Sequence, residues 1–538
     1  MSGVDEVTAP EPGRHYLHGY SSRQSVAPGE RVDLHVSTSL AGYSLTVARV
    51  GAGEVEVWRR ERIAGTEHPV PADASSHGCC WPPALELTVG REWPSGYYRV
   101  SMRGEAPGGQ PVRGAMAFVV RSAAPGRTAR ILLQRTANTD NAYNRYGGST
   151  LYYGPDGPAT RVSFERPFAG FEPIGDYRYS IPKDLEVTGD GRTLTDEMAA
   201  ALAERGVDTA RPTFLRPARV ADCWNLQQAE LTLGLHRQSG RVDVYDSFSS
   251  WASCWHNWEG PFVAWAERAG YRIDYAVSGD LEFHPEILDR YRLGLSVGHD
   301  EYWSKPMRDH LEDYIGRGGN VAFLSGNCAW WQVRSEEEGR ALVCFKDHAL
   351  DPHFASGRHD TLTTMWCHRL IGRPENRLTG VSFAYGGYHR FFGMMEDGPD
   401  AYTVHRPDHW LFEGTGMDRG QVFGARDRIV GYECDGCRVA WRGGLPFPTH
   451  EDGTPESFHI AAHAPAALRR VDASVEQASR AILGDDGGTL PQPGLAVMGT
   501  YTRGGTVVTA GCTEWSNGLR GGDPTVDRIT RNILERLG

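Results

Sequence analysis

The sequence predicts two domains, an all-β domain over residues 14–122 and an α/β domain over residues 127–538. Three observations support this prediction. A chain of 538 residues is too long for one typical hydrophobic core. Short alternating runs of polar and apolar residues fill the first part, and after the linker at 122–126 strand patterns alternate with helix patterns.

The first domain is predicted to be an immunoglobulin-like β-sandwich. Its period-2 runs are separated by Gly, Pro and Ser, and no stretch has a helical period. The predicted strands are residues 31–36, 43–47, 85–89, 96–100 and 115–120.

The second domain is predicted to contain a parallel sheet of the class I glutamine-amidotransferase type. Ser304 begins a helix to residue 315, on which Met307, Leu311, Tyr314 and Ile315 form one apolar face that can cover a sheet. The other predicted elements are strands at 129–134, 271–277, 293–298, 320–324 and 505–510, helices at 261–269 and 525–537, and a helical turn at 284–289. Residues 172–250 interrupt this pattern as an insertion with one helix at 194–204, and the chain becomes strand-rich after residue 331.

Composition excludes several classes of partner. Lys and Arg number 56 against 68 Asp and Glu, which gives a net charge of -12, and the basic residues are scattered, so we expect no nucleic acid partner. No apolar run reaches the roughly 18 residues of a membrane span, and residues 1–6 lack a signal-peptide pattern, so we expect a soluble cytoplasmic protein without a membrane partner. The ten cysteines are thinly spread, which favours reduced thiols, and the lone CxxC of Cys434 and Cys437 does not indicate a zinc site.

Functional residues are expected in three loops. In an open parallel sheet the ligand crevice lies at the carboxyl ends of the strands. The loops that follow predicted strands at this edge are residues 136–153, 298–304 and 325–331.

Two of these loops carry polar side chains suited to catalysis. His299 and Glu301 are close enough in sequence for one to ligate a metal while the other serves as an acid, a base or an oxyanion donor, but acidic residues before a helix are also common caps. Asn327 can donate a hydrogen bond to an oxyanion. Its neighbour Cys328 is either a nucleophile or a buried packing residue.

Five ordered motifs resemble the large (beta) subunit of N,N-dimethylformamidase. They cover the chain from about residue 127 to the C-terminus and leave the predicted sandwich outside the resemblance. The motifs lie at residues 141–152, 298–304, 409–416, 431–436 and 511–519.

The resemblance implies a mononuclear Fe(III) centre and hydrolysis of a small amide by metal-activated water. Carried over by motif, the metal ligands are Tyr143, in preference to Tyr152, and Glu301, with Tyr179 chosen from Tyr177, Tyr179 and Tyr245 as the second tyrosine. His299 and Asn327 match the active-site residues expected to bind the oxyanion, and Glu433 matches the glutamate that acts on water. We expect a homo-oligomer or a complex with a small partner subunit.

The local sequence around Glu433 leaves its role open. Residues 428–433 read as a strand that leads to a turn at Asp435 and Gly436, so Glu433 is either a solvated strand end or a catalytic base.

Two other functions remain open at this stage. A Trp-rich cleft could bind a carbohydrate or another ring ligand without chemistry. A distant histidine could instead join His299 and Glu301 in the facial triad of an iron oxygenase. The residues concerned are Trp251, Trp255, Trp258, Trp330 and Trp331 for the cleft, and His405, His409, His459 and His463 for the triad.

Overall fold

The computed structural model describes residues 15–152, 154, 157–168, 255–389, 400–467, 473–484, 487–490 and 493–538. The predicted insertion at 172–250, with its helix at 194–204, and the candidate ligand Tyr179 therefore lie outside the described residues.

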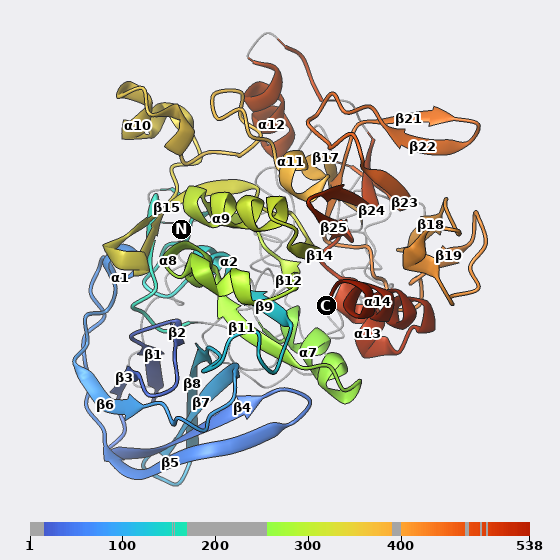
Figure 1. The fold of residues 1–538 in the computed structure, drawn as a ribbon. Coiled ribbons are helices and arrows are strands. Elements are labelled where there is room, and N and C mark those ends of the chain that lie inside the picture. The colour runs from blue at the N-terminus through green and yellow to red at the C-terminus, as the bar shows by residue number, and fades with distance from the viewer. Residues whose placement is uncertain are drawn as a thin grey trace, which may run out of the picture.

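The N-terminal part is built of two β-sheets that enclose one core (Figure 1). Alternating residues of these strands are buried, and Leu34, Val47, Val100 and Phe118 meet between the sheets. The three-stranded sheet has the order β1 (Leu17–Ser21), β3 (Arg31–Thr38) and β6 (Pro83–Thr88). The five-stranded sheet has the order β2 (Ser25–Val26), β8 (Pro111–Val120), β7 (Gly96–Glu105), β4 (Gly42–Val50) and β5 (Glu54–Ala64).

A nine-stranded mixed sheet forms the centre of the second part. Its first five strands are parallel, as the alternating helices and strands predict, and the strand-rich C-terminal part continues the same sheet in antiparallel fashion. The order is β11 (Ile273–Val277), β9 (Ile131–Arg135), β12 (Leu293–His299), β14 (Asn320–Gly326), β25 (Gly505–Thr509), β24 (Gly494–Arg503), β23 (His459–Ala466), β18 (Tyr402–Val404) and β19 (Val422–Phe423).

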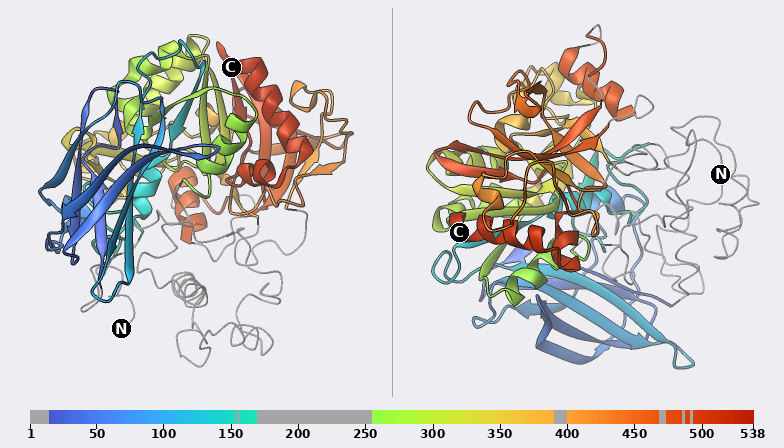
Figure 2. Two further views of the ribbon diagram at one scale, coloured as in Figure 1. Left: turned by 90° about the horizontal axis from the view of Figure 1, so that it is seen from below. Right: turned by 90° about the vertical axis from the view of Figure 1, so that its right-hand side faces the viewer.

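Helices cover both faces of this sheet (Figure 2). On one face, α7 (Glu259–Arg268), α13 (Trp515–Gly521) and α14 (Pro524–Leu537) pack against residues such as Leu133. On the other face, α8 (Ser278–Phe283), the 3-10 helix η3 (Pro285–Arg290) and α9 (Lys305–Gly316) pack against residues such as Leu132. The Ser304 hydroxyl caps α9 by accepting a hydrogen bond from the Met307 N–H, and the predicted apolar face of α9 is buried.

Smaller elements surround the carboxyl edge of the parallel strands. A four-stranded sheet contains β10 (Arg161–Ser163), β16 (Ala341–Val343), β15 (Trp331–Glu336) and β13 (Tyr302–Ser304), and two-stranded sheets pair β17 (Ser382–Tyr388) with β20 (Glu433–Gly436) and β21 (Val439–Arg442) with β22 (Leu445–Pro448). The remaining helices are α1 (Ala74–His77), α2 (Ala137–Tyr143), η4 (Glu337–Gly339), η5 (His348–Leu350), α10 (Pro352–Ala355), η6 (His359–Thr361), α11 (Asn376–Thr379), η7 (Trp410–Phe412) and α12 (Ala473–Leu483). No helix in the described ranges is long and apolar enough to cross a membrane.

The predicted strand at 428–433 is wrong. Residues 424–432 form turns and irregular backbone, with Arg428 at a φ of 52°, and the strand β20 starts only at Glu433. Asp435 and Gly436, which were expected to turn, lie inside β20 because this strand pairs with β17. Tertiary pairing therefore overrides the local Asp-Gly turn signal.

The two parts are joined by partly buried polar contacts as well as by apolar packing. Asp280 at the start of α8 accepts hydrogen bonds from Ser25 (2.6 Å) and Arg121 (2.7 Å) of the N-terminal part. Arg49 donates to Glu267 of α7 over 2.6 Å. These contacts fix how the N-terminal sheets sit against the nine-stranded sheet.

Candidate active site

Glu301 is the centre of a buried cluster of oxygen-bearing side chains. Its Oε2 atom accepts a hydrogen bond from the Tyr143 hydroxyl over 2.8 Å. Its Oε1 atom accepts hydrogen bonds from the Tyr152 hydroxyl and, over 2.8 Å, from the Trp331 indole N–H. The cluster thus places two phenols on one carboxylate inside the protein.

The backbone before Glu301 has a conformation that requires glycine. Gly298 has a φ of +90°, and a Cβ atom there would lie 2.1 Å from the Cβ of Trp258. The Glu301 N–H donates to the Thr139 hydroxyl over 3.0 Å, which ties the segment to α2. Because Ser304 caps α9, the alternative that Glu301 is a helix cap is wrong.

The tyrosine-rich segment contributes both phenols. Residues 137–143 form α2, where the sequence predicted only a loop, and Tyr143 is the last residue of this helix. The rings of Tyr143 and Tyr152 stack with centroids 5.1 Å apart. The sequence favoured Tyr143 over Tyr152, whereas the structure brings both to Glu301; Tyr179 lies outside the described residues.

His299 lies between two carboxylates. Its Nε2 atom is 2.7 Å from Oε2 of Glu433 and 3.4 Å from Oε2 of Glu301. His299 ends β12 and Glu433 begins β20, so the ends of two strands that are distant in sequence meet here. Glu433 is only 3% exposed, and the alternative of a solvated strand end is therefore wrong.

Asn327 occupies the turn after β14 in a left-handed conformation with a φ of 48°. The Asp435 carboxylate accepts hydrogen bonds from the backbone N–H groups of Asn327 (2.9 Å) and Cys328 (3.1 Å). The side-chain Oδ1 of Asn327 is buried without a hydrogen-bond partner among the described residues. The strand β20 therefore carries Glu433 to His299 and, two residues later, the carboxylate that shapes the Asn327 turn.

Cys328 does not have the environment of a nucleophile. Its thiol is buried, and burial raises its pKa well above the usual range. Ser325 lies 2.8 Å from the sulfur. The alternative of a packing cysteine fits this environment, because a thiol without thiolate character is unreactive.

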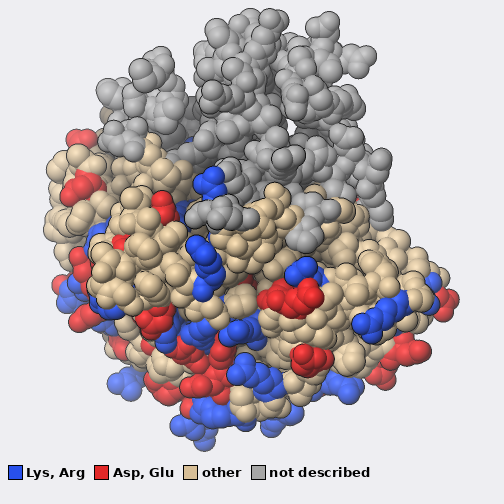
Figure 3. Space-filling view, turned by 90° about the horizontal axis from the view of Figure 1, so that it is seen from above, with Lys and Arg blue, Asp and Glu red and all other residues tan. Residues whose placement is uncertain are grey.

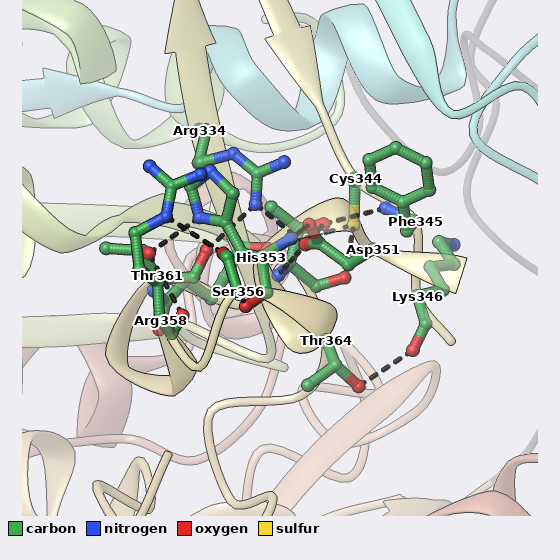
Figure 4. A network of polar contacts seen from close by, with 12 residues as sticks. Arg334, Cys344, Phe345, Lys346, Asp351, His353, Ser356, Arg358, Thr361 and Thr364 are labelled. Atoms are coloured by element: carbon green, nitrogen blue, oxygen red, sulfur yellow. Dashed lines mark hydrogen bonds and ion pairs between the residues drawn. The ribbon is translucent and has the colours of Figure 1, made fainter. Parts of the chain in front are cut away.

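Lys346 is a site residue that the sequence did not reveal. Its Nζ atom is buried with no hydrogen-bond partner in the described part of the chain and lies 2.9 Å from the Tyr152 ring centroid. Burial lowers its pKa to about 7, against the opposing effect of Glu301. A network centred on Asp351 holds the segment that carries Lys346, whose carbonyl accepts a hydrogen bond from Thr364 over 2.7 Å (Figure 4).

The comparisons with known proteins agree with the motifs. A family model described as N,N-dimethylformamidase beta subunit-like, C-terminal, matches residues 44–528. The chain belongs to this family. Beta subunits of N,N-dimethylformamidase from an Alcaligenes species and from Paracoccus aminophilus are each 25% identical to it, over 321 and 324 residues. Each alignment covers 52% of this chain and 37% of the relative, so the match spans well under half of the relatives' length.

The family match corrects one expectation. It begins at residue 44, within β4, and so includes most of the N-terminal sheets, which the motif-based resemblance left outside. Among solved structures, Bacillus subtilis Spo0M, a sporulation control protein, and murine CRIg each match 21% of the chain at 15% identity. Their TM-score of 0.15 is too low to inform the fold.

The cluster around Glu301 offers oxygen donors of the kind that suit a hard cation. Burial raises the pKa of Glu301, and burial together with Glu301 raises the pKa values of Tyr143 and Tyr152 well above the usual range. The Glu301 carboxyl group and the hydroxyls of Tyr143 and Tyr152 therefore converge at one point. Their raised pKa values favour the protonated forms as long as no cation balances the negative charge. No group of three His, Cys, Asp or Glu side chains in the described ranges is arranged for a metal, so the phenols are needed to complete such a site.

The tryptophans of the proposed ligand-binding cleft are buried where they are described, and the histidines considered for an oxygenase triad contact other groups. Trp255, Trp258, Trp330 and Trp331 are all buried, with Trp255 stacked on Tyr97 at 4.2 Å, and Trp251 lies outside the described residues. His405 and His463 contact each other over 2.6 Å, and His409 contacts Thr500 over 3.0 Å. These three histidines contact groups other than Glu301, and His459 begins β23, where it pairs with Thr500.

Proposed function

We propose that this protein is an iron-dependent amidohydrolase that cleaves the C–N bond of a small amide. The observation that carries the proposal is the convergence of the Tyr143 and Tyr152 hydroxyls on the buried Glu301 carboxylate. Phenolate and carboxylate oxygens are hard anionic donors, which suit ferric iron. Family membership supports amide hydrolysis, because the curated relatives are N,N-dimethylformamidase subunits.

Tyr143 and Glu301 would hold the ion, and Tyr152 is the second phenol that the described geometry offers. A bound ferric ion would supply a Lewis acid that polarises an amide carbonyl and makes water a nucleophile near neutral pH. The Lys346 amine faces the Tyr152 ring, and a positive charge there favours the phenolate form of the tyrosine. Tyr179 remains a competing prediction for the second ligand.

Other residues of the chain would transfer the proton and bind the oxyanion. Glu433 accepts the proton that the attacking water must lose. His299, which the resemblance assigned to the oxyanion, has its Nε2 atom 2.7 Å from this carboxylate and can instead pass the proton to the departing amine nitrogen. The Asn327 amide donates to the oxyanion of the tetrahedral intermediate. The Asp435 carboxylate holds Asn327 in the left-handed turn that this role requires.

We also propose an assembly with another subunit. The relatives are named as beta subunits, which supports a small partner subunit or a homo-oligomer for this chain as well.

Metal analysis of the purified full-length chain tests the function. We expect about one iron per chain, a visible tyrosinate-to-iron charge-transfer band and hydrolysis of N,N-dimethylformamide as the test amide. Glu301→Ala should remove the iron, the band and the activity. Protein with no bound metal favours the ligand-binding alternative, and O₂ consumption without amide cleavage favours the oxygenase.

The second phenol ligand can be assigned by a pair of variants. Tyr152→Phe and Tyr179→Phe each remove one hydroxyl. Because Tyr143 still contributes a band in both variants, the variant whose charge-transfer band shifts and weakens identifies the second ligand, and we expect this to be Tyr152→Phe.

A further inference from the structure

Arg166 is a fully buried arginine that makes no ion pair with a carboxylate in the described ranges. Each of its hydrogen-bond acceptors is a carbonyl oxygen. Its Nε donates to Ser163 O over 2.8 Å. The two terminal nitrogens donate to the backbone oxygens of Asn141 (3.1 Å), Asn144 (2.9 Å), Tyr146 and Ser149 (3.4 Å), and to Oδ1 of Asn141 (3.2 Å).

These acceptors belong to the segment that carries the two site phenols. Tyr143 lies between Asn141 and Asn144, and Tyr152 follows Ser149 by three residues. Beyond the end of α2 the segment has no regular ladder of backbone hydrogen bonds, so its carbonyls need other partners, and such groups are costly when buried without them. One guanidinium with five fixed N–H groups satisfies several of them at once and thereby defines the path of the loop.

The N-terminal sheets hold Arg166 in place from the other side. The Cys79 N–H donates to the carbonyl of Glu165 over 2.7 Å, next to Arg166. Tyr146, from the same loop, is buried with Tyr20 and Trp81 of the N-terminal part, and its ring meets Trp81 edge-on at 6.4 Å. The loop is therefore fixed between the first part of the chain and Arg166.

We propose that Arg166 is a positioning residue that holds residues 141–152 in the one conformation in which both phenols reach Glu301. Only the expected change in ferric affinity rests on the proposed function. The conformation of the loop is a separate claim that can be measured on metal-free protein.

The test uses Arg166→Lys in the full-length chain. Lysine keeps the charge, but its single nitrogen can donate at most three hydrogen bonds and cannot reproduce the planar fork. Hydrogen–deuterium exchange of the peptide spanning 141–152, measured on metal-free protein, should become at least about ten-fold faster than in the wild type. Ferric affinity, measured by competition with a chelator, should fall by about 10–100-fold, as is typical when residues that orient metal ligands are changed.

Arg308→Lys is the matched control. Arg308 is also fully buried and donates to the carbonyls of Arg373 (2.6 Å) and Pro374 (2.9 Å). It differs from Arg166 in an ion pair with Glu312 over 2.7 Å, and it lies on α9, away from the loop that carries the phenols. It should lower the melting temperature comparably while leaving loop exchange and ferric affinity unchanged. If Arg166→Lys does not fold, Asn141→Ala removes one acceptor and should shift both readouts in the same direction by a smaller factor.

The outcomes separate this proposal from the function. Unchanged loop exchange in a folded Arg166→Lys variant, or in Asn141→Ala where the first variant does not fold, would overturn the role of Arg166. Equal effects of the two lysine variants on the loop would do the same, because they would show general destabilisation. A wild-type protein that binds no ferric ion contradicts the proposed function, while faster loop exchange in the same experiment would still support Arg166 as the residue that holds the loop.

Discussion

The contact between Glu433 and His299 identifies the Glu433 carboxylate as the proposed acceptor of the water proton. Both side chains are buried, and the Nε2 atom of His299 lies 2.7 Å from Oε2 of Glu433. Glu433→Gln keeps the size of the side chain but cannot accept that proton, and we expect turnover to fall by about 10²–10⁴-fold with iron content unchanged. The measurement is amide hydrolysis at saturating substrate, alongside metal analysis. A variant that keeps more than about a tenth of wild-type turnover would remove Glu433 from the mechanism.

Asn327 and Cys328 are neighbours whose substitution should have opposite consequences. Asn327→Gly removes the amide but tolerates the left-handed φ of 48°, so we expect an intact fold and a loss of about 10²–10³-fold in turnover. Cys328→Ala should change turnover little, because the buried thiol has no thiolate character. Comparing kcat of the two variants decides between them, since loss of activity in the cysteine variant alone would indicate a thiol mechanism.

The sequence placed several site residues correctly relative to strands, and it could do so because strand ends converge at one edge of a parallel sheet. His299 and Asn327 follow neighbouring strands, and the structure puts both there. Lys346 could not be found in this way, and Tyr152 entered only as the less favoured alternative to Tyr143 in the loop that follows the first predicted strand of the sheet. Their side chains reach Glu301 and the Tyr152 ring through loops whose path depends on tertiary contacts, which no periodicity records.

At the scale of elements, the turn after β12 depends on one glycine. Gly298→Ala would add strain of about 1–3 kcal/mol at a φ of +90°, and its methyl group would collide with Trp258. We expect lower stability and lost ferric binding, measured by urea unfolding and metal analysis. Gly316→Ala at the end of α9 is the control, because its Cβ would meet nothing within 4 Å and alanine favours helix. Equal unfolding midpoints for the two variants would contradict the strain argument.

Elements with a clear period were predictable and elements shaped by pairing were not. The helix α9 has both a cap and an apolar face in its sequence, and the structure shows both. The strand β5 was missed because the alternation of residues 54–57 is interrupted by a run of charged residues, which are exposed at the edge of the sheet. The strand predicted at 428–433 failed for the opposite reason, since local β-propensity did not find a pairing partner there.

For the whole molecule, layering explains where the site lies. The nine-stranded sheet is covered on both faces, so its polar chemistry is confined to the carboxyl edge, where β10, β15 and β20 close over it. Lys and Arg side chains are interspersed with Asp and Glu on the face seen from above (Figure 3).

Buried carboxyl groups away from the site should make global stability depend on pH. Glu375 is fully buried, and burial raises its pKa to about 8. Because the folded-state pKa lies above the unfolded value near 4.5, the stabilisation is complete below about pH 4.5 and is lost as pH rises through about 8. Glu375→Gln cannot ionise. The difference between the unfolding free energies of variant and wild type should therefore shift in favour of the variant as pH rises from 5 to about 8. Urea unfolding of both proteins at several pH values isolates this group, since all other titrations are shared. Parallel pH profiles would show that Glu375 is ionised in the folded protein and that another group compensates its charge.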